Sequence, residues 1–301
     1  MTVIALTGGT GFVGSHVIET VLAAGHELRA LTRRPQPAQM GVTWIAGALD
    51  DPTSLAELMR GADAVLHVAG LVDAPDRAAF AAGNIEGTRA MLTAAQTAGI
   101  ARFVHVSSLS AREPTLSDYG WSKAGAEALV AASPLDWTIV RPPGVFGPRD
   151  TETLPLFQFA ARGVTPMPAK GGRASWIYAR DLAEFLVLTA DPAMFPRTTV
   201  EPDDGTPGGW EHRAFGRAVG TAVGRRVLAF SLPAPLLRTA SWIGQRVGGP
   251  LRKLTPDRVG YLLHRDWVSH ARPPADVWRA RTDTPAALAA TAAWYRAAGL
   301  L

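Results

Sequence analysis

Short apolar runs alternate with helix-like stretches through the first half of the chain. The runs are rich in Val, Ile and Leu, as is typical of strands buried on both faces of a parallel sheet. They occupy 3–7, 26–32, 42–47, 63–70, 102–108 and 136–142, with helical patterns at 12–24, 52–60, 78–98 and 118–132 between them. Strand–helix alternation at this spacing predicts an α/β fold with a doubly wound parallel sheet.

The second half of the chain has a different pattern. Pro and Gly become more frequent after the sixth apolar run, as in "GVTPMPAKGG", and the regular alternation stops. Helical patterns return at 151–162, 181–190, 210–222, 233–247, 255–263 and 284–299. We therefore expect two domains, with 1–150 carrying the sheet and 151–301 forming a smaller mixed, mainly helical lobe interleaved with the first.

The composition is that of an ordinary globular protein, with 47% hydrophobic and 19% charged residues. The chain contains no cysteine, which excludes disulfides, a thiolate nucleophile and a zinc–thiolate site, and its histidines lack metal-ligand spacing. The first apolar run is too short for a signal peptide, and no run reaches the ~18 apolar residues that span a bilayer. We expect a cytoplasmic protein without a bound metal.

Charge is distributed unevenly along the chain. Residues 1–150 carry 11 Lys and Arg against 14 Asp and Glu, whereas residues 151–301 carry 19 against 12. A basic half of this kind can meet an inner membrane surface, a phosphorylated ligand or a protein partner, and the simpler alternative is a solvated basic surface. No basic patch is interleaved with aromatic residues, so we expect no nucleic-acid partner.

The most specific motif is "TGGTGFVG" at 7–14, which joins the first expected strand to the first expected helix. Glycines permit a tight turn and let backbone amides approach a pyrophosphate, while the helix N-terminus favours that anion. The motif predicts a Rossmann-type domain that binds a dinucleotide. The residues concerned are Thr7, Gly8, Gly9, Gly11, Phe12, Val13 and Gly14.

The end of the second strand bears on the choice between NAD(H) and NADP(H). The segment "RALTRRPQ" has no acid that would bind a ribose 2′-hydroxyl, and it carries Arg33 and Arg34. We expect NADP(H) in preference to NAD(H), with two plain surface arginines as the alternative. After the third strand, Leu49 and Asp50 can reach the adenine, or they form an ordinary turn.

Tyr119 and Lys123 stand four residues apart in an expected helix, "SDYGWSKAGAE". Positions i and i+4 lie on one helix face, so an ammonium ion would lie beside a phenol and lower its pKa. A tyrosine with a lowered pKa can act as an acid or base near neutral pH. The alternative is a solvated helix face, which a two-residue pattern alone does not exclude.

Several motifs in order resemble the extended or atypical short-chain dehydrogenase/reductases of the NAD-dependent epimerase/dehydratase family. The resemblance covers about residues 3–190 and depends on order and spacing rather than on any single tetrapeptide. The motifs are "TGGTGFVG" (7–14), "HVAG" (67–70), "NIEGT" (84–88), "VSS" (106–108), "YGWSK" (119–123), "RPPGVFGPRD" (141–150) and "YARDLAEF" (178–185).

The resemblance implies roles at the matching positions. Tyr119 would be the general acid/base, Lys123 would hold the nicotinamide ribose, and Ser108, or less favourably Ser107, would bind the substrate oxygen. The lobe at 151–301 would bind a small-molecule substrate, and the family tends to form homodimers through the helix of this pair. Asn84 and Thr88 would belong to a helix that supports the active site. Positions near the cofactor would be Val68, Ala69, Gly70, Asn84, Ser107, Lys123, Pro142 and Val145.

One departure from the family pattern leaves the activity open. Only ten residues, "LSAREPTLSD", separate Ser108 from Tyr119, fewer than is usual in extended members. The short connection resembles the branch that includes the NADPH-binding accessory subunit of respiratory complex I. The expected function is an NADP(H)-dependent oxidoreductase acting on a carbonyl or secondary alcohol. The alternatives are a non-catalytic NADPH-binding or redox-sensing subunit of a membrane complex, and a sugar-nucleotide epimerase or dehydratase.

The segment 230–270 is similar to the C-terminal part of sterol- and flavonoid-reductase-like members, which favours an apolar substrate. Leu236, Ala240, Ile243 and Val247 fall on one helical face. That face could meet an apolar substrate, a bilayer surface or a partner. We expect instead that it packs on the core, as most apolar helix faces do.

Overall fold

The computed structural model describes residues 1–168, 170–247 and 254–301, and the chain divides into two compact units. Unit 1 comprises Met1–Pro142, Arg180–Pro202 and Ala271–Pro273, and unit 2 comprises Pro143–Ala179, Asp203–His270 and Pro274–Leu301. The sequence placed the division at residue 150. We also expected the two parts to be interleaved; in the structure the chain leaves unit 1 after Pro142 and returns to it twice.

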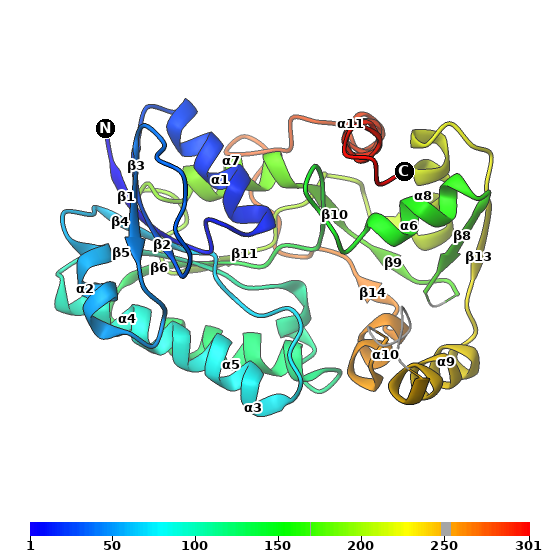
Figure 1. The fold of residues 1–301 in the computed structure, drawn as a ribbon, viewed down its shortest axis with the longest axis horizontal. Coiled ribbons are helices and arrows are strands. Elements are labelled where there is room, and N and C mark those ends of the chain that lie inside the picture. Colours follow the sequence, from blue (N-terminus) through cyan, green and yellow to red (C-terminus); the bar gives the residue numbers. More distant parts are fainter. Residues whose placement is uncertain (169, 248–253) are drawn as a thin grey trace. The chain divides into compact units, whose positions relative to one another are not determined.

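Unit 1 is built on a seven-stranded sheet in which every neighbouring pair is parallel (Figure 1). The strand order is β11-β6-β5-β4-β1-β2-β3, so the chain builds outward from β1 in one direction and from β4 in the other. This is the doubly wound arrangement that the apolar runs predict. The strands are β1 (Val3–Thr7), β2 (Glu27–Thr32), β3 (Val42–Ala46), β4 (Ala64–His67), β5 (Arg102–Val106), β6 (Asp136–Val140) and β11 (Thr198–Val200).

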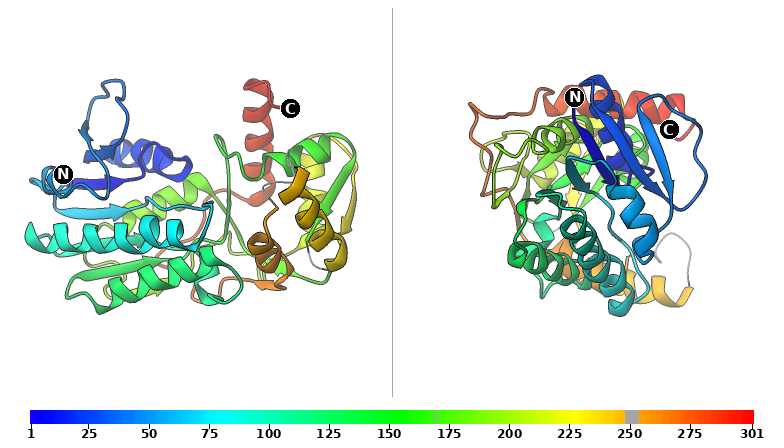
Figure 2. Two further views of the ribbon diagram at one scale, coloured as in Figure 1. Left: turned by 60° about the horizontal axis from the view of Figure 1, so that its bottom comes forward. Right: turned by 90° about the vertical axis from the view of Figure 1, so that its left-hand side faces the viewer.

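Helices cover both faces of this sheet. On one face lie α1 (Phe12–Ala23) and α7 (Ala179–Leu188), and on the other lie α2 (Pro52–Met59), α4 (Gly87–Thr97) and α5 (Asp118–Ala132) (Figure 1). Helices α4 and α5 run side by side beneath the strands (Figure 2, left). Strand and helix side chains such as Val65, Phe103, Leu58 and Met91 share one core, which is why these runs are apolar throughout.

The segment that the sequence predicts as one helix over 78–98 has three parts. A helical turn, α3 (Arg77–Phe80), leads into the π-helical turn η1 (Ala81–Glu86), and α4 follows. Wider π-turns frequently occur at functional sites because they redirect a side chain. Here the π-turn carries Asn84, which is buried.

Unit 2 has several helices with short strands between them. Its core is aromatic: Trp176 and Phe215 stack with ring centroids 3.9 Å apart, and Phe146, Phe157 and Tyr295 pack in the same cluster. The helices are α6 (Leu154–Ala161), α8 (His212–Ala222), α9 (Ala234–Val247), α10 (Pro256–Leu263) and α11 (Thr284–Ala297). The short strands are β7 (Gly144–Phe146), β8 (Val164–Met167), β9 (Arg173–Ala174), β10 (Trp176–Tyr178), β12 (Trp210–Glu211), β13 (Leu228–Ser231) and β14 (Asp266–Trp267).

The predicted helices of the second half are all present, whereas the short strands were not predicted. Strands of two to four residues are too brief to show an alternating pattern in the sequence. Within the described ranges, no helix is both long enough and apolar enough to cross a bilayer.

Candidate functional site

The chemistry-bearing motifs of unit 1 meet where the strand order reverses. Strands β1 and β4 are neighbours, and the loops that follow them contain Gly8 and Val68 to Gly70. Gly8 has φ +77°, and a Cβ on it would lie 2.7 Å from the backbone nitrogen of Ala69. The two loops therefore touch through backbone atoms, and only glycine fits between them.

The glycine loop, residues 8–11, connects β1 to the start of α1. Gly11 is the N-cap residue, and no side chain in the described part of the chain caps this helix end. A Cβ on Gly14 would lie 2.0 Å from the carbonyl oxygen of Gly8, so the loop folds tightly over the helix. Uncapped amides and a positive helix end form a cradle that fits a pyrophosphate, with Thr7, Phe12 and Val13 beside it.

The expected coenzyme-discriminating residues follow β2. Arg33 and Arg34 are exposed, and neither guanidinium has a partner among the described residues. They are therefore available to a phosphate at this end of the sheet. Leu49 packs against Gly87, where a Cβ would lie 2.8 Å from the leucine side chain, and Asp50 is exposed beside it.

Asn84 fixes the loop that follows β4. Its side-chain oxygen accepts a hydrogen bond from the backbone N–H of Leu71 (2.7 Å), and its amide donates to Leu71 O (3.0 Å) and to Ser122 Oγ (2.9 Å). Thr88 Oγ1 donates to the carbonyl of Asn84 (2.7 Å). Asn84 therefore ties the β4 loop to α5, the helix that carries Tyr119.

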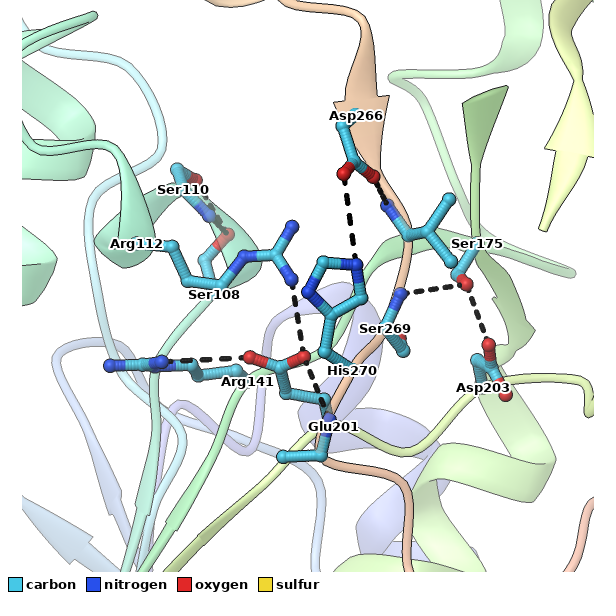
Figure 3. A network of polar contacts seen from close by, with 12 residues as sticks. Ser108, Ser110, Arg112, Arg141, Ser175, Glu201, Asp203, Asp266, Ser269 and His270 are labelled. Atoms are coloured by element: carbon cyan, nitrogen blue, oxygen red, sulfur yellow. Dashed lines mark hydrogen bonds and ion pairs between the residues drawn. The ribbon is translucent and has the colours of Figure 1, made fainter. Parts of the chain in front are cut away.

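Tyr119 and Ser108 come together across the short connection. Ser108 caps the 3-10 helix η2 (Leu109–Arg112), and its hydroxyl is 2.6 Å from Ser110 Oγ (Figure 3). The Ser108 hydroxyl also acts on the Tyr119 phenol as a hydrogen-bonding neighbour and lowers its pKa. The tight 3-10 turn explains how ten residues suffice to bring the tyrosine back to the serine.

The pKa of Tyr119 shifts in the direction opposite to the one expected. Burial raises this pKa, and only the hydrogen bond from Ser108 lowers it. The prediction that Lys123 depresses it was wrong for this arrangement, because helical spacing gives proximity but not contact. Lys123 Nζ instead donates to the carbonyl of Val106 at 2.7 Å.

Lys123 is buried beside the end of β4. A Cβ on Gly70 would lie 3.5 Å from Lys123 Nζ, so the ammonium is next to the loop expected to flank the cofactor. Burial lowers the pKa of Lys123 to about 8, and Glu127 one turn further along α5 opposes that shift. The lysine is therefore charged at neutral pH and can bind a hydroxyl oxygen.

Ser107 does not share the position of Ser108. Its hydroxyl is buried and donates to Glu127 Oε1 (2.5 Å), whereas Arg141 donates to both oxygens of Glu127 (2.8 and 2.6 Å). Arg141 also lies 3.5 Å from the buried Glu201 carboxylate, which pairs with Arg112 (Figure 3). The Ser107 hydroxyl is thus part of an ionic network that includes Glu127 and Arg141.

The roles of Glu127, Arg141 and Glu201 were not predicted from the sequence. The only signal was the spacing of Glu127, which follows Lys123 by four residues on the same helix. The buried histidines His67 and His105 were not predicted either. His67 forms hydrogen bonds with Thr7 (2.7 Å) and Thr88 (3.1 Å). Burial and the nearby Lys123 lower the pKa of His67 to about 3, so it is neutral.

Of the last two residues predicted near the cofactor, Pro142 lies in unit 1 and Val145 lies in unit 2. Pro142 ends the first segment of unit 1, Met1–Pro142. Its carbonyl accepts a hydrogen bond from the backbone N–H of Leu109 (3.0 Å). Val145 lies on β7 in unit 2, paired with Ile177 of β10. The structure thus gathers the glycine loop, the β4 loop, Asn84, Ser108, Tyr119 and Lys123 in unit 1.

Comparison with known proteins agrees with this geometry. The model of a family described as NAD(P)H-binding matches residues 8–187, from the glycine loop to the end of α7. The chain belongs to this family. A ceramide reductase of Caulobacter vibrioides is 37% identical over 99% of this chain and 96% of its own length. A 3β-hydroxysteroid dehydrogenase/Δ5→4-isomerase of Mycobacterium tuberculosis is 27% identical over 91% of this chain and 85% of its own length.

Solved structures confirm the fold of this NAD(P)H-binding protein. The structure titled MoeE5 in complex with UDP-glucose and NAD superposes with a TM-score of 0.75 at 20% identity, covering 99% of both chains. The doubly wound fold that the motifs predicted is thus shared with a solved structure that contains NAD. With these relatives, the chain is an NAD(P)-dependent oxidoreductase.

Proposed function

We propose that this protein is an NADPH-dependent reductase that converts a ketone on a long-chain lipid amide of the ceramide class into a secondary alcohol. The observation that carries the reaction type is the buried Tyr119 phenol, which has the Ser108 hydroxyl as its neighbour and shares helix α5 with the buried Lys123. The substrate class is supported by 37% identity with a ceramide reductase along nearly the whole chain.

The residues of unit 1 divide the work of ketone reduction. When bound, the nicotinamide would supply the hydride. Tyr119 donates its phenolic proton to the oxygen of the ketone as that oxygen becomes an alkoxide, and Ser108 donates a second hydrogen bond to the same oxygen. Ketone, NADPH and one proton thus give secondary alcohol and NADP⁺.

Lys123 and Asn84 take no part in the proton transfer; they position the coenzyme and the helix that carries Tyr119. The Lys123 ammonium, charged below its pKa of about 8, would hold the ribose hydroxyls of the coenzyme. The raised pKa of Tyr119 keeps the phenol protonated at neutral pH, which is the form that reduction requires. Burial of Asn84 and Ser122 fixes α5 against the β4 loop, so the acid and the cofactor cradle keep one geometry.

Turnover of a defined ketone tests the proposal. Purified protein is incubated with NADPH and a ceramide that carries a ketone in its sphingoid chain, and the lipid is analysed by mass spectrometry. We expect conversion to the alcohol, matched mole for mole by NADPH oxidation. Reduction of a steroid ketone but not of the ceramide ketone would overturn the substrate class. Epimerisation of a UDP-sugar with NAD retained would overturn the reaction type.

The coenzyme preference depends on Arg33 and Arg34. Replacing both by alanine removes the free cations after β2, and charge-assisted bonds to a phosphate are worth about 1.5–3 kcal/mol. We expect the Kd for NADPH to rise roughly ten- to a hundred-fold with little change for NADH. Titration of coenzyme fluorescence measures both values.

A matched control for the coenzyme test is Arg60→Ala, which removes another exposed arginine from unit 1. This variant should keep the wild-type Kd for both coenzymes. An equal loss of NADPH and NADH binding in the Arg33→Ala/Arg34→Ala variant would contradict a role in reading the 2′-phosphate.

A further inference from the structure

Unit 2 contains a long stretch without a single acid. Between His212 and Pro256 the sequence has no Asp or Glu, whereas it has eight Lys and Arg. Six of these eight cations lie in α8, in α9 and between α8 and β13, and the other two follow α9 in the sequence. Such a one-sign field attracts an anionic surface rather than another ordinary protein face.

The apolar face expected on α9 does not pack on the core. Leu237, Ser241 and Gly244 are the side of α9 that is buried, whereas Leu236 is 53% exposed and Ile243 is 39% exposed. The prediction that this face packs on the core was therefore wrong for Leu236 and Ile243. Ala240 is half-buried, and the side chain of Val247 lies outside what the structure describes. Helix α9, which contacts α10 (Figure 1), thus buries Leu237 with two small residues and leaves Leu236, Trp242 and Ile243 exposed.

Other large apolar side chains near this helix are exposed too. Trp242 on α9 is 57% exposed, and the guanidinium of Arg246 lies 3.8 Å from its ring centroid. Leu228 and Phe230 on β13, the strand before α9, are also exposed. An arginine over an exposed tryptophan is an amphipathic pair suited to an interface between water and hydrocarbon.

A cavity of about 610 Å³ opens between β13, α9 and α10. Its apolar wall includes Phe230 and Leu263. Four cations line it, and none of them has a carboxylate partner among the described residues: Lys170, Arg213, Arg238 and Arg265. Uncompensated cations above an apolar wall suit an anionic head group with an attached acyl chain.

We propose that this face docks on the surface of a bilayer containing anionic phospholipid. The β13–α9 face is defined by Leu228, Phe230, Leu236, Arg238, Trp242, Ile243 and Arg246, with the cationic cavity beside it. Its apolar side chains enter the boundary between head groups and acyl chains, and its arginines bind lipid phosphates. The inference depends on unit 2 alone and does not require the proposed reaction.

The mixture of charge and apolar surface favours a bilayer over the other anionic partners. A nucleic acid would use the arginines but would leave Leu228, Leu236 and Ile243 in water. A second copy of this chain that docked through the same face would present the same positive charge and repel it. Of these three partners, only the lipid surface matches both the arginines and the exposed apolar side chains of the β13–α9 face.

Vesicle co-sedimentation of the full chain tests the proposal. We expect the protein to pellet with vesicles of phosphatidylcholine and phosphatidylglycerol but not with phosphatidylcholine alone, and to be released by high salt. Arg238→Glu/Arg246→Glu should weaken partitioning about ten-fold or more, because each cation near an anionic surface contributes measurably. Trp242→Ala should weaken partitioning onto the vesicles several-fold, because it removes an apolar side chain that enters the bilayer.

Arg279→Glu is the matched control, since Arg279 is exposed in unit 2 but lies outside the acid-free stretch. Coenzyme fluorescence shows that each variant still binds NADPH and is folded. Equal losses in Arg279→Glu and Arg238→Glu/Arg246→Glu would overturn the proposal, as would unchanged vesicle binding in Trp242→Ala. A dimer that dissociates in Trp242→Ala would assign the face to self-association instead.

Discussion

Replacing Tyr119 with phenylalanine should lower kcat by about 10²–10⁴-fold, the range that a positioned general acid contributes. The ring remains, so its contact with Phe80, with centroids 6.1 Å apart, and the packing of α5 are kept. Only the hydroxyl that meets Ser108 is lost. Steady-state kinetics with the ketone substrate and NADPH measure the change.

The loss should appear in kcat and leave NADPH binding close to wild type, because the cradle and Lys123 remain intact. Tyr261→Phe is a matched control that removes a phenolic hydroxyl in unit 2, where the ring stacks on Trp267 at 4.6 Å. It should retain full activity. Unimpaired turnover in Tyr119→Phe would contradict the acid role, and turnover that disappears only there would exclude a purely cofactor-binding subunit.

Gly8→Ala should abolish NADPH binding, with an affinity loss of at least about a hundred-fold. An alanine at φ +77° costs about 1–2 kcal/mol in backbone strain. The larger effect is the clash of its Cβ with the backbone nitrogen of Ala69, 2.7 Å away. Two backbone segments must separate, which widens the cradle that the pyrophosphate needs. Coenzyme titration and denaturant unfolding measure affinity and stability in parallel.

Gly25 offers a closely matched comparison. Its φ is +74°, but nothing lies within 4 Å of a Cβ built there. Gly25→Ala should therefore have the same backbone strain as Gly8→Ala but no clash. We expect it to lose only about 1–2 kcal/mol in the free energy of unfolding and to keep NADPH binding. If both variants bound NADPH equally well, the close approach of the β1 and β4 loops would have no role in holding the coenzyme.

The parts of the molecule that local sequence determines could be predicted. The first six strands and the helices follow from apolar periodicity, and the glycine loop follows from a turn that only glycine permits. Ser108, Tyr119 and Lys123 lie within one strand–loop–helix segment, so their neighbourhood was accessible as well. The π-turn at Asn84 was not, because its sequence differs little from that of an ordinary helix.

The parts that depend on contacts between distant residues could not be predicted. Arg112 and Glu201 are 89 residues apart, and Arg141 joins both carboxylates of the buried network. The upward pKa shift of Tyr119 follows from burial, which sequence spacing does not report. The side of α9 that packs inward is likewise decided by its neighbours, which bury Leu237, Ser241 and Gly244 and leave Leu236 and Ile243 exposed.

The division of the chain into discontinuous pieces has a consequence for how the protein can be made and altered. Strand β11, which covers the outer edge of β6, and the segment 271–273 are translated long after the other strands of unit 1. Until they emerge from the ribosome, β6 presents a bare edge of the kind that pairs wrongly with other chains. No single cut releases either unit, so truncation or exchange of the C-terminal half would damage the nucleotide sheet as well.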